Sequence, residues 1–215
     1  MRIGVLGTGT VGQTVALALV RAGHEVRMGA RQAGNERAVG WAEEAGAAGS
    51  EGTFADATGF GELVVNCTAG TGSLEALAAA GEERLAGKTL IDVANPLDFS
   101  TGELRLFACN DDSLGERIQA AFPRARVIKA LNTVNAAVMV DPASVPGDHV
   151  VFVCGEDQAA KRKVTELLGE FGWPAERVVD LGGIAAARGT EMYMMLWLGL
   201  MDTLGTTEFN ITLAR

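Results

Sequence analysis

A glycine turn near the amino terminus constrains the fold of this chain more than any other feature. Gly7, Gly9 and Gly12 follow a short apolar run, residues 3–6, and open a segment with helical spacing of apolar residues, 11–22. In that setting GxGxxG is typical of the first turn of a dinucleotide-binding βαβ unit. The first glycine permits a tight turn, the second leaves room for a pyrophosphate, and the third lets helix and strand pack closely. A purely structural turn is the alternative, but it does not explain why all three glycines have this spacing.

The rest of the chain alternates between strand and helix patterns. Strands are predicted at 3–6, 24–28, 53–54, 63–67, 89–93, 126–130, 150–153 and 178–181. Helices are predicted at 11–22, 36–44, 74–80, 113–122, 158–171 and 185–204. This alternation predicts an α/β fold with a doubly wound, mostly parallel sheet of the Rossmann type and a small C-terminal helical extension. We expect a nucleotide-binding domain over residues 1–132 and a smaller part over 133–215 that completes the cleft.

Composition excludes several classes of function. Eighteen basic and 27 acidic residues give a net charge of −9, which disfavours nucleic acid and anionic membranes as partners. Cys67, Cys109 and Cys154 lack CxxC spacing, so we expect neither a disulfide framework nor a metal site. The most apolar stretch, 192–200, is too short to span a bilayer, and no export signal is present at the amino terminus. The pattern favours a cytoplasmic protein.

The end of the second predicted strand bears on which nucleotide is bound. Proteins of this fold that prefer NAD carry an Asp or Glu roughly 20 residues after the glycine turn, where it binds the ribose 2′-hydroxyl. Here the segment reads Gly29-Ala30-Arg31-Gln32 and has no carboxylate. The guanidinium of Arg31 suits a 2′-phosphate, and Arg37 offers a second charge, although an exposed arginine on a helix is often merely solvated. The sequence therefore favours NADP(H) over NAD(H).

The carboxyl ends of the later strands, where ligands bind in such sheets, carry small and amide residues. These segments are 66–70, 94–97 and 130–133. None of their side chains is a strong proton donor or acceptor at neutral pH, so we expect no catalytic acid or base. His24 and His149 are interpreted as surface histidines.

A site without an acid or base favours hydride transfer between a nicotinamide and a flavin-like ring, because stacking geometry does most of that work. The C-terminal segment offers an apolar wall for such a ring, consisting of Met192, Tyr193, Met194, Met195, Leu196, Trp197, Leu198 and Met201. A core or dimer helix is the alternative interpretation, and both roles can coexist, so a homodimer is expected. Cys67 can contact the cofactor or act as a small buried hydrophobe.

The opening IGVLGTGTVGQTVALALVRAGHEVRMGAR, the segments VIKALNTVNAAVMVDP and VFVCGEDQAAKRKV, and the tail from DLGG to LWLGLMDTLGTTEFNITLAR together resemble the NADP-dependent coenzyme F-420 oxidoreductase family. The resemblance implies a Rossmann domain for NADP(H) and a C-terminal part that completes a cleft for an 8-hydroxy-5-deazaflavin. It also implies roles for residues of this chain: pyrophosphate at Thr8, Gly9, Thr10 and Val11, 2′-phosphate at Ala30 and Arg31, nicotinamide at Thr68, Ala69 and Asn95, and deazaflavin at Asn132.

Two positions depart from the family's pattern. Ala30 stands where Ser or Thr is usual, which removes a hydrogen bond worth about 1 kcal/mol and implies a weaker preference for NADP. Asn132 stands where the archaeal enzymes tend to carry His, which concerns the acceptor rather than the nucleotide. Two alternatives therefore stay open: an imine or 2-ketoacid reductase of related fold, and a sensor that binds NADP(H) without turnover.

Overall fold

The computed structural model describes residues 1–214, and within them the main sheet has eight strands in the order β10-β9-β8-β5-β4-β1-β2-β3. The strands are β1 (Arg2–Leu6), β2 (Glu25–Ala30), β3 (Gly49–Thr53), β4 (Leu63–Asn66), β5 (Thr89–Asp92), β8 (Arg126–Ala130), β9 (Val151–Cys154) and β10 (Val178–Asp180). All neighbours pair in parallel except β8 and β9. The predicted α/β class with a mostly parallel sheet is confirmed.

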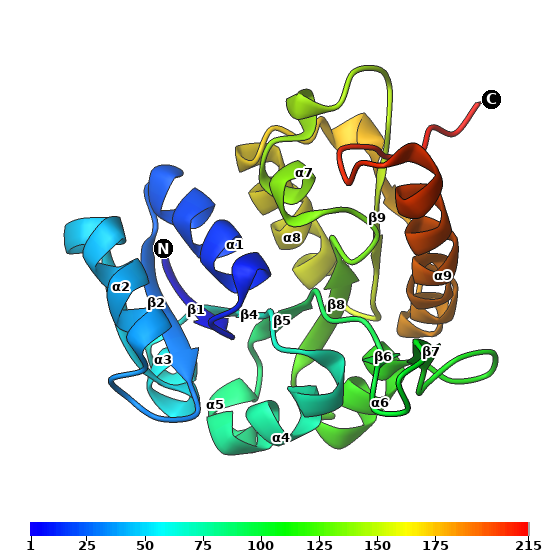
Figure 1. Ribbon diagram of the computed structural model, residues 1–215. Helices are drawn as coiled ribbons and strands as arrows, with labels where there is room; N and C mark the ends of the chain where they lie inside the picture. The colour runs from blue at the N-terminus through cyan, green and yellow to red at the C-terminus, as the bar shows by residue number, and fades with distance from the viewer. Residues whose placement is uncertain (215) are drawn as a thin grey trace.

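Helices cover both faces of this sheet (Figure 1). They are α1 (Thr10–Arg21), α2 (Glu36–Ala45), α3 (Phe54–Phe60), α4 (Gly70–Ala80), α5 (Glu82–Leu85), α6 (Leu114–Ala121), α7 (Ala136–Val140), α8 (Gln158–Glu170) and α9 (Ala187–Leu204). One apolar cluster packs α1, α2, α7 and α8 against the first face, and a second packs α3, α4, α5 and α6 against the other. Alternate residues of one strand reach opposite clusters, as Val5 and Leu6 do, so the sheet is buried on both sides.

The chain after Asn132 extends the same sheet. Helix α7 returns toward α1, β9 then runs antiparallel beside β8, and α8 leads to the edge strand β10. Helix α9 packs beside α6 (Figure 1). Within residues 1–214 no helix has both the length and the apolar character needed to cross a bilayer.

Several local predictions were wrong. The strand predicted at 53–54 lies at Gly49–Thr53, and Phe54 already belongs to α3. The physical reason is a capping box: the Thr53 hydroxyl accepts from the Asp56 amide at 3.1 Å, while the Asp56 carboxylate accepts from the Thr53 amide at 2.9 Å. Helices α3, α5 and α7 and the hairpin formed by β6 (Leu97–Asp98) and β7 (Arg105–Leu106) were not predicted, because each is too short to show periodicity.

The interpretation of the two histidines as surface residues was also wrong. His24 and His149 are each only 7% exposed. The His24 ring contacts Glu170, and His149 Nε2 lies 2.9 Å from the carbonyl oxygen of Pro142. The partner of His24 is distant in the sequence, and the partner of His149 is a backbone carbonyl oxygen. Neither contact can be recognised from a local sequence pattern.

Candidate functional site

The glycine turn between β1 and α1 has the geometry that its three glycines require. Gly7 adopts a φ of +113°, and a Cβ on Gly12 would lie 2.1 Å from the Gly7 carbonyl oxygen. No atom lies within 4 Å of the place where a Cβ on Gly9 would stand. The fold therefore requires glycine at positions 7 and 12, whereas Gly9 borders open space.

The start of α1 is free to receive an anion. Its N-cap, Gly9, offers no side-chain hydrogen bond, as is also the case at α4, α5 and α9, whereas the other α-helices are capped by side chains. The unpaired amide groups of the first turn and the helix dipole there favour a phosphate. Gln13 Nε2 donates to the Thr8 carbonyl oxygen at 2.9 Å and so holds the loop in place.

A cavity of about 380 Å³, here called the glycine-turn cavity, opens beside this loop. Its lining consists of Gly7, Thr8, Gly9, Ala30, Arg31, Asn35, Phe54, Cys67, Thr68, Ala69, Gly72 and Ala76. The Arg31 side chain is 77% exposed, with Nε 4.0 Å from Glu75 Oε1, so this weak surface pair leaves the guanidinium accessible to an anion. Asn35 was missed by sequence reasoning; it caps α2 by accepting from the Ala38 amide.

Three predicted site residues line neither this cavity nor the larger one described next. Thr10 is exposed on the first turn of α1, and Gly12 is buried beneath the loop. Arg37 is exposed on α2 and lines neither this cavity nor the larger one described next. Arg31 therefore stands as the one predicted cation that reaches the cavity among the described residues.

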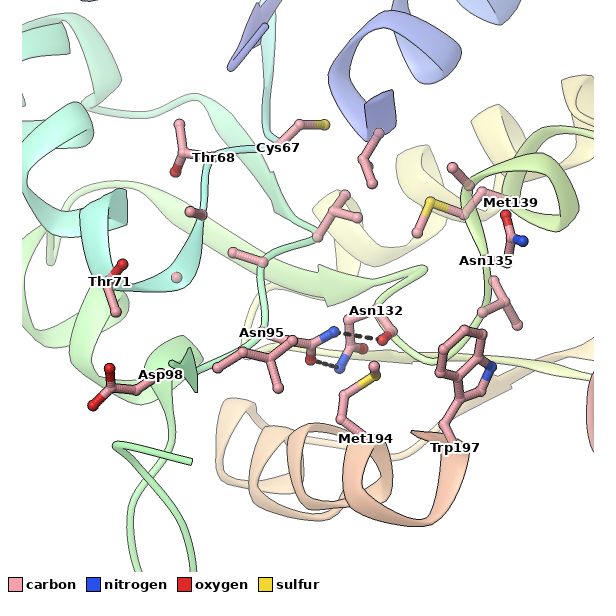
Figure 2. A pocket seen from close by; sticks show the side chains of 18 of the residues that line it. Cys67, Thr68, Thr71, Asn95, Asp98, Asn132, Asn135, Met139, Met194 and Trp197 are labelled. Atoms are coloured by element: carbon pink, nitrogen blue, oxygen red, sulfur yellow. Dashed lines mark hydrogen bonds between the residues drawn. The ribbon is translucent and has the colours of Figure 1, made fainter. Parts of the chain in front are cut away.

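A larger cavity of about 770 Å³, here called the apolar cavity, lies beyond the carboxyl ends of β4, β5 and β8 (Figure 2). Its apolar side chains are Val11, Val93, Leu97, Phe99, Val134, Met139, Met194 and Trp197. Cys67, Thr68 and Ala69 line both cavities, so the two are neighbours across one strand-to-helix turn. Its volume falls in the range that small ligands and cofactors occupy.

Two predicted amides pair at the floor of the apolar cavity. Asn95 Nδ2 donates to the Asn132 carbonyl oxygen at 2.8 Å, and Asn132 Nδ2 donates to Asn95 Oδ1 at 2.9 Å (Figure 2). Leu131, buried just before Asn132, has a φ of +63°, a left-handed conformation that costs a non-glycine residue about 1 kcal/mol. The strained turn brings Asn132 to Asn95.

Helix α9 contributes part of the apolar wall that the sequence predicted. Met194 and Trp197 project from it into the apolar cavity (Figure 2), and the Trp197 ring stacks on Phe209 with centroids 5.3 Å apart. Met195 and Leu196 are instead exposed, because successive residues of a helix point in different directions. The predicted wall was therefore correct for one face of α9 only.

Titratable groups in the apolar cavity are held away from proton chemistry near neutral pH. Desolvation, aided by Asp92, raises the pKa of the Cys67 thiol, so it remains neutral. Asp98, which sequence reasoning missed, accepts from the Ser100 amide at 2.9 Å and from Arg105 Nε at 2.8 Å. These bonds lower the pKa of Asp98 to about 2, so its carboxylate is ionised and already paired.

Beneath the cavity floor lies a buried polar chain that sequence reasoning also missed. The Thr68 hydroxyl donates to Asn66 Oδ1 at 2.7 Å, and Asn66 Nδ2 donates to Asp92 Oδ1 at 2.8 Å. Lys129 Nζ then contacts Asp92 Oδ2 at 2.6 Å. Charged residues inside strand patterns gave no local signal of this arrangement.

Comparison with known proteins agrees with this geometry. Residues 2–96 match the family described as "NADP oxidoreductase coenzyme F420-dependent". A crystal structure from Arthrobacter sp. FB24, provisionally described as an F420-dependent NADP reductase, is 50% identical with a TM-score of 0.94, and the match covers 100% of both chains. This chain belongs to the F420-dependent NADP oxidoreductase family. It is an oxidoreductase of that family, with the Rossmann nucleotide-binding domain that the family shares.

Curated proteins from an archaeon and a mammal are also similar to this chain. The F420-dependent NADP reductase of Methanothermobacter marburgensis is 29% identical, and the match covers 93% of this chain and 92% of that protein. Rat Metalloreductase STEAP3 is 28% identical over 88% of this chain. The match spans 36% of the length of the rat protein and 53% of the length of the F420-dependent NADP reductase of Methanocaldococcus jannaschii, which is 31% identical over 55% of this chain.

Proposed function

We propose that this protein transfers a hydride between NADPH and a deazaflavin such as coenzyme F-420, or a flavin, held in the apolar cavity. The observation that carries the proposal is the turn of Cys67, Thr68 and Ala69, which lines both cavities. A dinucleotide with its pyrophosphate at the start of α1 extends in two directions from there. Its adenosine end lies toward Arg31 and its nicotinamide end toward the shared turn, which leaves the apolar cavity for a second ring.

The residues that we assign to the nucleotide follow this path. They are Gly7, Thr8, Gly9, Thr10, Val11 and Gly12 for the pyrophosphate, Ala30, Arg31 and Arg37 for the 2′-phosphate, and Cys67, Thr68, Ala69 and Asn95 for the nicotinamide. Asn132 is assigned to the acceptor side. The two fastened amides, Asn95 and Asn132, offer fixed polar atoms beside apolar walls, which is the lining that orients a flat heteroaromatic ring.

Positioning is the catalytic contribution that we assign to these side chains. NADPH, when bound, would supply the hydride to the acceptor ring, and one proton from water would complete the reduction of the acceptor. Met139, Met194 and Trp197 surround the ring with apolar and polarisable groups, which limit its orientations and exclude water from one side. Neither the neutral Cys67 nor the paired Asp98 is required as a proton donor.

Stopped-flow mixing tests this function. Protein loaded with NADPH is mixed with oxidised coenzyme F-420 and, separately, with FMN, and the loss of acceptor absorbance is compared with NADPH oxidation. We expect both signals to be lost rapidly and to the same extent. Gly9→Ala protein is the control, because this substitution alters the proposed NADPH site and leaves the apolar cavity intact. Tight NADPH binding without oxidation by either acceptor would favour a sensor, and turnover of an imine or 2-ketoacid instead would favour a reductase of that class.

Two further features belong to the same proposal. We assign residues 1–132 to the nucleotide-binding part and residues 133–215, of which 215 lies outside the described residues, to the smaller part that completes the cleft. A homodimer is proposed because Met195 and Leu196 are exposed on α9, at 46% and 59%, on a side of the helix that does not face the apolar cavity. Light scattering coupled to gel filtration tests it, and a monomer mass would contradict it.

A further inference from the structure

One buried ammonium group joins three parts of the fold. The Lys129 side chain on β8 is only 1% exposed, and its Nζ lies 2.6 Å from Asp92 Oδ2 and 2.7 Å from Glu191 Oε1. The same nitrogen donates to the Ala94 carbonyl oxygen at 2.7 Å. An ammonium has three hydrogens, so all three donors are used. They go to the end of β5, the turn that follows it, and α9.

Both carboxylates of this cluster have further partners. Glu191 accepts from the amides of Leu114 and Gly115 at 2.7 and 3.0 Å, and these two residues begin α6. Glu191 is thus also placed at the positive end of the α6 dipole. Burial disfavours the Lys129 ammonium, but the carboxylates of Asp92 and Glu191 prevail and raise its pKa, so the group stays charged at neutral pH.

The cluster touches the two sides of the apolar cavity without lining it. Ala94, which receives one of the three hydrogens, belongs to the cavity floor together with the neighbouring Asn95. On the other side, Met194 lies three residues after Glu191 on α9, and Trp197 three residues after that, so all three share one helix face. Lys129 therefore links the cavity floor directly to α9, beside the Arg188–Glu116 pair that holds the start of α9 to α6.

We propose that Lys129 and Glu191 are positioning residues that fix the orientation of α9 and its distance from β5. They thereby determine the affinity for the acceptor ring, whereas the affinity for NADPH does not depend on them. The inference rests on the proposed function for the use of the apolar cavity. A purely apolar contact would let a helix slide or rotate at small cost, whereas the directed bond from Lys129 to Glu191 ties α9 to an ammonium that its bonds to Asp92 and Ala94 hold at the end of β5. Buried ion clusters add little net stability as a rule, which makes a role in specifying geometry the better account of this one.

Two substitutions test the proposal, with one matched control. Lys129→Met removes the three bonds while keeping an unbranched chain, and Glu191→Gln keeps the shape of Glu191 but removes its charge. Lys161→Met is the control, because Lys161 is also a buried lysine, 4% exposed, and pairs with Asp180 at 2.8 Å. Neither Lys161 nor Asp180 lines either cavity.

Three quantities are measured for each variant: the Kd for NADPH by calorimetry, KM and kcat for the acceptor, and hydrogen exchange of the α9 and α1 amides. Lys129→Met is expected to raise the acceptor KM about tenfold and to speed exchange in α9 by at least about tenfold, with the Kd for NADPH within about twofold and exchange in α1 unchanged. Glu191→Gln should move the same quantities in the same direction by a smaller factor. Lys161→Met should leave the acceptor KM and α9 exchange at wild-type values.

Parallel changes in the acceptor KM and the Kd for NADPH would overturn the proposal, and so would α9 exchange that equals wild type in both variants. If Lys129→Met fails to fold, Glu191→Gln decides, since it alters one functional group. If wild-type protein reduces no acceptor, the proposed function fails by itself. Hydrogen exchange then decides the positioning role: loss of protection confined to α9 supports it, and unchanged protection contradicts it.

Discussion

The two cavities that meet at Cys67, Thr68 and Ala69 are built in different ways. The glycine-turn cavity takes five of its twelve lining residues from the turn between β1 and α1 and from the end of β2, within the first 31 residues, and the other seven from positions 35–76. The apolar cavity takes side chains from α1, the ends of β4, β5 and β8, the β6–β7 hairpin, α7 and α9. The phosphate contacts proposed at the glycine turn and Arg31 depend on residues near the amino terminus, while the apolar cavity depends on segments from the whole length of the chain that only folding brings together.

The largest expected effect separates two glycines of the same turn. Gly12→Ala should destabilise the fold by about 3 kcal/mol, because its Cβ would meet the Gly7 carbonyl oxygen at 2.1 Å. Gly9→Ala should change the free energy of unfolding by less than about 0.5 kcal/mol, because its Cβ enters open space and its φ of −77° suits alanine.

Gly9→Ala should nevertheless weaken NADPH binding at least about tenfold, because the added methyl occupies space left for the pyrophosphate. Chemical denaturation measures the free energy of unfolding of both variants, and calorimetry measures their affinity for NADPH. Wild-type affinity in folded Gly9→Ala protein would refute the placement of the phosphates, and equal stability of the two variants would refute the contrast.

The next largest effect distinguishes NADPH from NADH. Arg31→Ala should weaken NADPH binding by roughly 10- to 100-fold, since a charge-assisted hydrogen bond contributes about 1.5–3 kcal/mol, and should leave NADH binding nearly unchanged. Arg37→Ala, at the second arginine assigned to the 2′-phosphate, should weaken NADPH binding by less than about threefold, because Arg37 is exposed and lines neither cavity. Titration of all three proteins with both nucleotides checks this, and equal losses for NADPH and NADH would exclude the 2′-phosphate role.

A smaller effect should be confined to the apolar cavity. Asn132→Ala removes the bond from Asn132 Nδ2 to Asn95 Oδ1 but keeps the one from Asn95 Nδ2 to the backbone of residue 132. We expect a loss of about 1 kcal/mol in stability and a several-fold rise in acceptor KM, with the Kd for NADPH unchanged. Steady-state kinetics together with nucleotide titration measures both. A change in the Kd for NADPH of the same size would mean that the two cavities are not separable.

The smallest effect concerns the hairpin at the rim of the apolar cavity. Hydrogen bonds from Ser100 and Arg105 hold the pKa of Asp98 at about 2, below its ordinary value near 4 in an unfolded chain. A depressed folded-state pKa gives stability that is present above about pH 4 and is lost as the pH falls toward 2. The difference in Tm between wild type and Asp98→Asn should therefore be constant above pH 5 and vanish near pH 2. A difference that persists at pH 2 would contradict the assignment.

The amino-acid sequence by itself determined the parallel α/β fold, the glycine turn and the approach of Arg31, because each depends on residues close together in the chain. Predicted helix and strand cores were confirmed wherever the apolar periodicity was long, as in α1 and α8. Only the tertiary structure decided the Asn95–Asn132 pair, the cavity-facing side of α9 and the burial of His24. It alone also brought Lys129 to Glu191. A charged residue in a strand or helix pattern is expected at the surface, and its burial depends on partners that local sequence cannot identify.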